Sequence, residues 1–268
     1  RESEFKREGD NNRLTIQMTI IRIEGYGPWT LTLGSDREGV LQMLQARIYY
    51  DVQRLFSERE SLVFANRYDE YFAITNGLST QDHILIQKEL EKIYNNLKLS
   101  MTIGNGMTSF EANMNAYDAR RTGKLLDKRA RIFGKECSNL DSVYDFAQIM
   151  HIDIDGSTNV GSKISPYEIA SLVSKIHASL SEEFLKKESM TFFIGGDNFM
   201  VISNGTTKQD AEKIIERVTK GMDIKLNCGI GVGRTGRKAA EAATRALDTI
   251  RSLRNEGKIQ PFYEIECL

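Results

Sequence analysis

The pattern of apolar and polar residues in the first half of the chain predicts strands that alternate with helices. Short β-branched or aromatic runs predict strands, and apolar residues that recur every three or four positions predict helices. The predicted strands span 14–23, 62–64, 71–74 and 99–103, and the predicted helices span 40–56, 82–97 and 108–133. A turn rich in glycine and proline is expected at 24–30, and Gly123 lies within the last predicted helix.

The second half follows the same order of elements, so an internal repeat organises the chain. The matched pairs are Glu24/Gly27 with Asp153/Gly156 at a spacing of 129 residues, Asp69 with Asp197 and Asn76/Gly77 with Asn204/Gly205 at 128, and Gly104/Gly106 with Gly231/Gly233 at 127. These matches predict two copies of a βαββαβ unit, each followed by a helix. The predicted fold class is α+β, with antiparallel sheets and helices packed on one face.

The domain boundaries follow from this repeat. Residues 1–13 are polar without periodicity, and we expect them to form a disordered tail. The first unit is predicted at 14–134, a linker at 135–145 and the second unit at 146–268. Each unit, at roughly 120 residues, is long enough to bury a core of its own.

The hairpin predicted in the second unit carries an aspartate at its tip. Apolar runs at 191–194 and 199–202 flank Gly195 and Gly196, which supply the positive φ angles of a tight turn before Asp197. Asp153 ends the preceding strand, and a right-handed crossover places that strand beside the second arm of the hairpin. Two facing carboxylates repel each other unless a cation lies between them, and Mg²⁺ with phosphate oxygens is the usual solution. Asp153 and Asp197 therefore predict a site for a nucleoside triphosphate.

These features also have structural interpretations. Aspartate is common in turns, so a single hairpin aspartate indicates little. The Gly-x-Gly segments at 104–106 and 231–233 lack the third glycine of a dinucleotide site, and we expect them to let the fourth strand turn sharply into the last helix. An acid at both positions in both copies favours the functional interpretation. The glycine turn favours the second copy as the metal site.

Composition narrows the class of protein. The net charge of −1 gives no electrostatic footprint for nucleic acid, and no apolar run approaches the ~20 residues of a membrane span, so we expect a cytoplasmic protein without either partner. The three cysteines, Cys137, Cys228 and Cys267, are widely spaced and form no metal-ligand pattern with the three histidines. A zinc site or a disulfide framework is therefore not expected.

Four motifs together resemble a known family. The segments EGYGPWT at 24–30, LQMLQAR at 41–47, RYD at 67–69 and FFIGGDNFM at 192–200 are similar to archaeal GTP cyclohydrolase III. The segments DIDGST at 153–158 and GGDNF at 195–199 also resemble the palm domains of class III nucleotidyl cyclases and GGDEF-type diguanylate cyclases. The likeness covers residues 15–268, and Glu24 stands where the family usually has aspartate.

The resemblance implies a tandem of ferredoxin-like palm domains that binds GTP through Mg²⁺, with two ions, K⁺ as an activator and no zinc. It implies a hydrolase that opens the imidazole ring of GTP to a formylaminopyrimidine nucleotide monophosphate and releases phosphate. The implied catalytic residues are Asp153, Asp197, Asp69 and Glu24; the implied metal ligands are Asp153, the carbonyl of Ile154, Asp197 and Glu24; the implied nucleotide contacts are Tyr26, Gly27, Trp29, Arg67, Ile154, Gly195, Gly196, Asn198 and Phe199.

GTP is the expected ligand. The chain is expected to form a homo-oligomer. If the copies share one nucleotide, the phosphates lie on the second copy and the guanine lies near Trp29 of the first. Two alternatives stay open. One is a nucleotidyl cyclase of the class III or diguanylate type, and the other is a catalytically inactive palm tandem that binds nucleotide.

Overall fold

The computed structural model describes residues 15–135, 145–156 and 164–267, so the predicted tail and most of the predicted linker lie outside the described residues. The elements of the first unit are β1 (Ile16–Ile23), α1 (Tyr26–Leu31), α2 (Arg37–Ser57), β2 (Leu62–Ala65), β3 (Glu70–Ile74), α3 (Thr80–Ile93), β4 (Leu99–Gly106), α4 (Ser109–Arg121), β5 (Leu125–Asp127) and β6 (Ile132–Gly134). The elements of the second are β7 (Ala147–Ile154), α6 (Pro166–Leu185), β8 (Met190–Gly195), β9 (Asn198–Ile202), α7 (Lys208–Thr219), β10 (Leu226–Gly233), α8 (Gly236–Asn255) and β11 (Phe262–Cys267).

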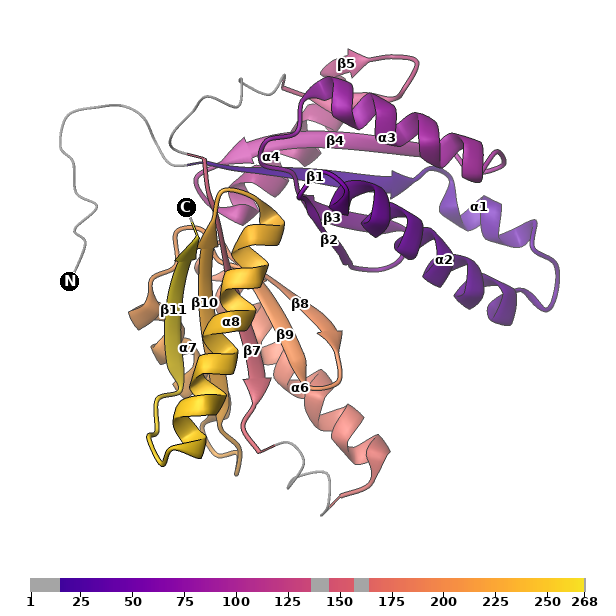
Figure 1. The fold of residues 1–268 in the computed structure, drawn as a ribbon. Helices are drawn as coiled ribbons and strands as arrows, with labels where there is room; N and C mark the ends of the chain where they lie inside the picture. Colours follow the sequence, from indigo (N-terminus) through magenta and orange to yellow (C-terminus); the bar gives the residue numbers. More distant parts are fainter. Residues whose placement is uncertain (1–14, 136–144, 157–163, 268) are drawn as a thin grey trace, which may run out of the picture.

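Each unit has its own sheet (Figure 1). The strand order is β2-β3-β1-β4-β6-β5 in the first sheet and β11-β10-β7-β9-β8 in the second. The four strands of each repeat pair antiparallel, which confirms the βαββαβ unit. The first strand of the second unit does lie beside the second arm of the hairpin, as predicted. β6 and β11 add a parallel strand at the outer edge of β4 and β10, which the sequence pattern did not predict.

Helices cover both faces of each sheet. The two helices inside each βαββαβ unit pack on one face, as predicted, but the helix that follows the unit packs on the other. Apolar residues of α2 and α3 pack with Ile21 and Ile23 of β1 in one core. The helix that follows each repeat packs on the opposite face, where Ala112 of α4 and Ala239 of α8 join Ile16 and Met18. The alternation of side chains along β1 separates these two cores.

Two local predictions were wrong. The expected turn at 24–30 contains the short helix α1, which follows Gly25 in the left-handed conformation. The helix expected at 108–133 ends at Arg121, because Gly123 has a φ of 68° and forms a Schellman motif. In this motif the N–H of Gly123 donates to the carbonyl of Arg120, and the N–H of Lys124 donates to that of Ala119. The chain then forms the β5–β6 hairpin.

The strand register corrects the first match of the repeat. β1 pairs with β4 so that Arg22 faces Ser100, and β7 pairs with β10 so that Asp153 faces Asn227. Ser100 and Asn227 are 127 residues apart, as in the Gly-x-Gly match. Arg22 is therefore the equivalent of Asp153, and Glu24 is the equivalent of Asp155. The prediction that Glu24 matches Asp153 slipped by two residues, which is one full period of a strand.

The two units contact each other through residues at equivalent positions of the repeat. This contact lies near α4 and α8 (Figure 1). Phe64 of β2 stacks on Phe192 of β8, with ring centroids 4.5 Å apart. The N–H of Phe110 in α4 donates to the carbonyl of Glu188 at 3.1 Å, and the N–H of Arg237 in α8 donates to that of Glu60 at the same distance. The contact is thus nearly two-fold symmetric.

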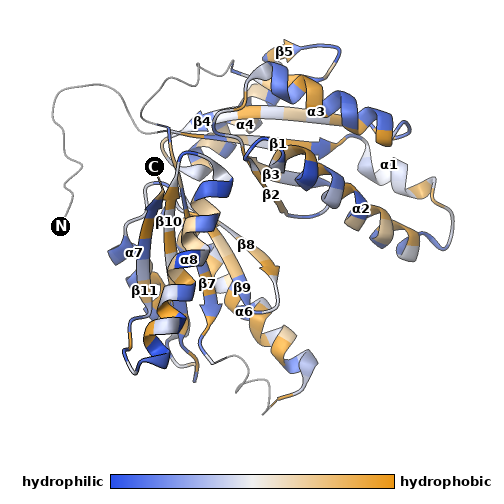
Figure 2. Ribbon diagram, viewed as in Figure 1, coloured by the Kyte–Doolittle hydropathy of each residue, from blue (hydrophilic) through white to orange (hydrophobic). Residues whose placement is uncertain are grey.

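Hydropathy follows this layering. In Figure 2, β8, β9 and β10 are largely orange, whereas α2, α3 and α6 alternate between orange and blue. β10 is buried along its whole length, as expected of a strand covered on both faces, whereas β8 at the sheet edge keeps Phe193 and Ile194 exposed. The alternation in the helices is typical of elements with one solvent-facing side. Within the described residues, the structure contains no helix with the length and apolar character needed to cross a membrane.

Candidate functional site

Asp153 lies near the end of β7 with only 5% of its surface exposed. Its carboxylate accepts a hydrogen bond from Asn227 Nδ2 at 3.0 Å on one oxygen and from Arg251 Nη2 at 2.8 Å on the other. Arg251 belongs to α8 and also pairs with Asp248 at 2.9 Å. Burial of a carboxylate is costly unless it is paired in this way.

A second carboxylate lies close to Asp153. Asp155 accepts from the same Asn227 Nδ2, at 3.4 Å, and forms an ion pair with Arg254 of α8. One amide nitrogen therefore holds two carboxylates together. The sequence interpretation preferred Asp153 and gave Asp155 no role. It missed Arg251 and Arg254, because no motif relates a strand end to a helix nearly 100 residues later.

The β8–β9 hairpin has the predicted glycine turn. Gly195 has a φ of 115° and Gly196 a φ of 60°, conformations that L side chains rarely adopt. A Cβ atom at Gly195 would meet nothing within 4 Å, so the turn leaves open space around its backbone. Asp197 at the tip is partly exposed and accepts a hydrogen bond from Asn198 Nδ2 at 3.1 Å.

Asp153 and Asp197 are linked only indirectly among the described residues. Nε2 of His151, next but one to Asp153 on β7, donates to Asn198 Oδ1 at 3.0 Å. Burial holds the pKa of His151 below its usual value, although the hydrogen bond to Asn198 and the charge of Asp153 raise it. His151 is therefore neutral at neutral pH, and it fixes the side chain beside Asp197. No described contact joins the two carboxylates directly.

A pocket of about 380 Å³ opens between α6 and this hairpin. Its walls include Pro166, Val173 and His177 of α6 and Phe193 and Gly196 of the hairpin. The size falls within the range of small-molecule sites. The sequence interpretation assigned His177 no role, because a single histidine on a helix has no distinguishing pattern.

His177 is held by aromatic neighbours. Its ring stacks on Phe199 at 6.0 Å, and its Nε2 is buried without a hydrogen-bond partner in the described part of the chain. Phe199 itself is fully buried. The predicted contact of Phe199 with a nucleotide therefore has no exposed surface to form on, because Phe199 belongs to the core of the second unit.

The equivalent end of the first sheet carries a different set of charges. Arg22, at the position of Asp153, forms an ion pair with Glu70, the residue directly opposite on β3. Glu24 accepts hydrogen bonds from both terminal nitrogens of Arg120 and from Ser100. The hydrogen bond from Arg120 holds the pKa of Glu24 below its usual value, against burial, which raises it. The guanidinium of Arg22 thus lies at the position that the carboxylate of Asp153 occupies in the second unit.

A positively charged side chain also lies at the hairpin tip of the first unit. Arg67 pairs with Asp69 at 2.9 Å and contacts Glu70 at 3.8 Å. Both acids at this end therefore have arginine partners from their own unit. Arg67 is more than two thirds exposed, so this pairing is weak, but it places Arg67 on an acid and not in an open phosphate site.

The other predicted contacts of the first unit lie in α1. Trp29 packs against Tyr26 with ring centroids 5.8 Å apart, both rings lie against the core of the first unit, and Gly27 is exposed beside them. Figure 1 shows α1 at the outer end of the first unit, away from the β8–β9 hairpin. The sharing of a single nucleotide by the two copies of one chain remains a prediction.

The donor set at the end of the second sheet suits Mg²⁺. Asp153 and Asp155 converge on one side chain, and Asp197 lies on the neighbouring hairpin. Among the described residues, no three His, Cys, Asp or Glu side chains come together. Mg²⁺ does not need such a cage, since it usually takes one or two carboxylates and completes its octahedron with phosphates and water.

Comparison with known proteins identifies one family across both units. A family model described as GTP cyclohydrolase III matches residues 18–262. The GTP cyclohydrolase III of Methanothermobacter thermautotrophicus is 38% identical over 239 residues, which make up 88% of this chain and 94% of that protein. That of Methanocaldococcus jannaschii is 38% identical over 237 residues, 88% of each chain.

Solved structures give a weaker likeness. The GGDEF domain of DgcB from Caulobacter crescentus, in complex with c-di-GMP, is 11% identical and covers 60% of this chain and 94% of that one, with a TM-score of 0.36. A TM-score this low carries no weight for the activity of the chain.

Proposed function

The chain belongs to the GTP cyclohydrolase III family, and we propose that it opens the imidazole ring of GTP at the end of its second sheet. The observation that carries the proposal is the asymmetry of the two sheet ends. Family likeness spans both units, but only the second has the buried Asp153 with a second carboxylate and an open glycine turn beside it. The equivalent position in the first unit is Arg22, which repels a cation.

We propose that Asp153 and Asp197 hold Mg²⁺, with Asp155 and the carbonyl of Ile154 close by. When bound, Mg²⁺ neutralises phosphate oxygens and lowers the pKa of a coordinated water. Arg251 neutralises Asp153 in the absence of a cation. Its second partner, Asp248, lets Arg251 keep one ion pair when it releases Asp153.

The hairpin supplies the surroundings of the triphosphate. Open space at Gly195 allows phosphate oxygens to approach the backbone of the turn, which no larger residue permits in that conformation. Asn198 is fixed by His151 and orients Asp197. The pocket beside Gly196 has apolar walls and one histidine, a lining of the kind found in small-molecule sites.

The proposed reaction adds water to C8 of guanine and breaks the C8–N9 bond, so that the C8 carbon remains as a formyl group on N7. Hydrolysis of the two phosphoanhydride bonds by two further water molecules releases two phosphate ions and leaves the monophosphate, 2-amino-5-formylamino-6-ribosylaminopyrimidin-4(3H)-one 5′-phosphate. The requirement for Mg²⁺, the second ion, activation by K⁺ and a homo-oligomer remain predictions. So does a cytoplasmic location.

Identification of the product tests the proposal. The chain is incubated with GTP and Mg²⁺, and the product is analysed by mass spectrometry and ultraviolet absorption. A formylaminopyrimidine nucleotide monophosphate with loss of the purine spectrum supports ring opening. A cyclic nucleotide with an intact purine spectrum would establish a cyclase, and unchanged GTP that binds tightly would establish a binding protein.

A further inference from the structure

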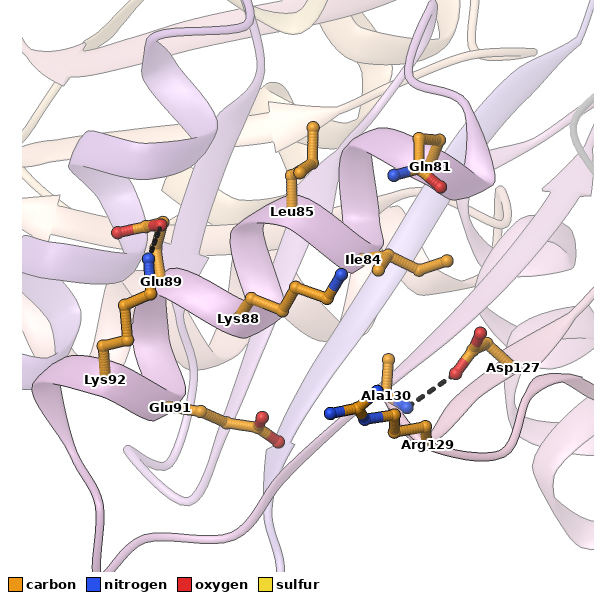
Figure 3. A pocket seen from close by; sticks show the side chains of 10 residues that line it. All are labelled: Gln81, Ile84, Leu85, Lys88, Glu89, Glu91, Lys92, Asp127, Arg129 and Ala130. Atoms are coloured by element: carbon orange, nitrogen blue, oxygen red, sulfur yellow. Dashed lines mark hydrogen bonds and ion pairs between the residues drawn. The ribbon is translucent and has the colours of Figure 1, made fainter.

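A pocket of about 670 Å³ lies in the first unit, between α3 and the β5–β6 hairpin (Figure 3). None of its residues belongs to the sheet end proposed for GTP. Ligand sites in proteins commonly have volumes of ~300–1,000 Å³, so the pocket can take a mononucleotide-sized molecule.

One wall of this pocket departs from the repeat. The β5–β6 hairpin pairs with the edge of β4 and closes over α3. In the second unit the equivalent helix α8 has 20 residues, compared with 13 in α4. The chain then passes directly from α8 to the edge strand β11, with no hairpin between them. The fold of the repeat therefore does not require the hairpin.

The carboxylates of the pocket are already engaged. Glu89 accepts from Lys92 at 2.6 Å, and Glu91 accepts from Arg131 at 2.7 Å. Asp127 Oδ1 accepts from the backbone N–H of Ala130 at 2.6 Å, which fixes the hairpin loop. Each acid thus has a partner in the structure.

Two cations of the pocket have no such partner in the described residues. Figure 3 shows Lys88 of α3 and Arg129 of the hairpin loop pointing toward the same space. Neither forms an ion pair within the described ranges. Beside them, Ile84 and Ala130 form an apolar floor, and Leu85 is 43% exposed at the rim.

We propose that this pocket binds a phosphorylated small molecule, with the phosphate between Lys88 and Arg129 and the uncharged body over Ile84 and Leu85. A guanidinium binds phosphate through two parallel hydrogen bonds, and an ammonium adds a point charge from the opposite wall. The apolar floor takes a ring or alkyl group and excludes water from it.

Calorimetric titration of the full chain with adenosine monophosphate at low ionic strength tests the proposal. The probe carries the required phosphate and lacks the guanine of the proposed substrate. Lys88→Met and Arg129→Met remove the charges and keep an unbranched apolar stem. Lys213→Met is the matched control, because it removes an exposed lysine from the equivalent helix α7 of the second unit.

We expect one binding site per chain, affinity weakened on the order of tenfold in each pocket variant, and no change in Lys213→Met. Inorganic phosphate should compete with the probe. GTP turnover and circular dichroism should be unchanged in all three variants. Absence of binding by the unmodified chain, or an affinity in Lys88→Met and Arg129→Met that is unchanged from that of the unmodified chain, would overturn the proposal.

Discussion

At the scale of single residues, buried side chains show how each charge is accommodated. His83 of α3 is fully buried, and its Nδ1 lies 2.7 Å from the carbonyl of Ser79, which can only accept. Nδ1 therefore carries the proton, and Nε2 of the neutral ring accepts from the Thr19 hydroxyl at 2.8 Å. Burial lowers the pKa of His83 to about 4, against the charge of Asp82 and the bond to Ser79.

This histidine predicts acid sensitivity. Between pH 6.5 and about 4 the unfolded chain takes up the His83 proton and the folded chain does not, so stability falls as pH falls through that window. The expected loss is about 3 kcal/mol. Urea unfolding of the protein and of His83→Gln at pH 7, 5.5 and 4.5 measures it. The variant should have the shallower pH dependence, and equal slopes would show that His83 does not titrate.

The sequence indicated the carboxylates and the glycine turn of the candidate site, but not the side chains that contact them. Asp153, Asp197 and the glycine turn lie at strand ends where local chemistry marks them. Arg251, Asn227 and His177 reach the site from elements far along the chain, and their side chains are ordinary for a helix or a strand. Only the packing of α6, α8 and β10 brings them to the site.

At the scale of elements, the Gly-x-Gly segments have a different purpose from the one expected. Gly231 of β10 does not need a positive φ, so it does not form a sharp turn. A Cβ atom there would lie 2.1 Å from the nitrogen of Ala243 and 2.2 Å from the oxygen of Ala239, both in α8. Gly104 of β4 stands in the same relation to Ala112 and Ala116 of α4. The glycines let each helix lie directly on its strand.

Gly231→Ala should therefore destabilise the protein by at least about 2 kcal/mol, because rigid backbone has to move. Gly39→Ala in α2 is the control, since nothing lies within 4 Å of its added methyl group, and we expect it to stabilise slightly. Thermal unfolding compares the two. Similar melting temperatures would mean that α8 can shift on the sheet without cost.

Element boundaries were predictable where a local signal fixes them. The capping boxes at Ser79, Ser165 and Thr207 begin helices as the residue types suggest. The β5–β6 hairpin and β11 were missed because short strands at a sheet edge depend on the strand already present there.

At the scale of the whole molecule, the sequence revealed two units but not how they meet. Their contact uses the outer face of each sheet, where Phe64 and Phe192 stack across the near two-fold axis and are both buried. An internal repeat in the sequence shows that the two units have the same fold, but it does not show which faces of the two units are in contact.

Phe192→Ala should lower the free energy of unfolding by about 3 kcal/mol, since it opens a cavity between the units. Phe193→Ala, one residue later and 46% exposed, should cost less than about 1 kcal/mol. In a double variant, Phe192→Ala and Phe64→Ala should lower the free energy of unfolding by less than the sum of the two single changes, because both rings belong to one contact. Urea unfolding of the unmodified chain, the three single variants and the double variant measures these changes. Strict additivity would contradict a direct stacking contact.

The central claim is that the second unit performs the reaction, and one matched pair of variants tests it directly. Asp197 and Asp69 are equivalent hairpin-tip aspartates. The strand paired with the Asp197 hairpin carries Asp153 near its end, whereas the strand paired with the Asp69 hairpin carries Arg22 at the equivalent position, and Asp69 itself pairs with Arg67. Initial rates of GTP turnover with Mg²⁺ are measured for Asp197→Asn and Asp69→Asn, with circular dichroism to confirm folding. We predict loss of most turnover in Asp197→Asn, because an amide binds Mg²⁺ far more weakly than a carboxylate, and near-normal turnover in Asp69→Asn. The reverse result, or an equal loss in both variants, would contradict the assignment of the reaction to the second unit.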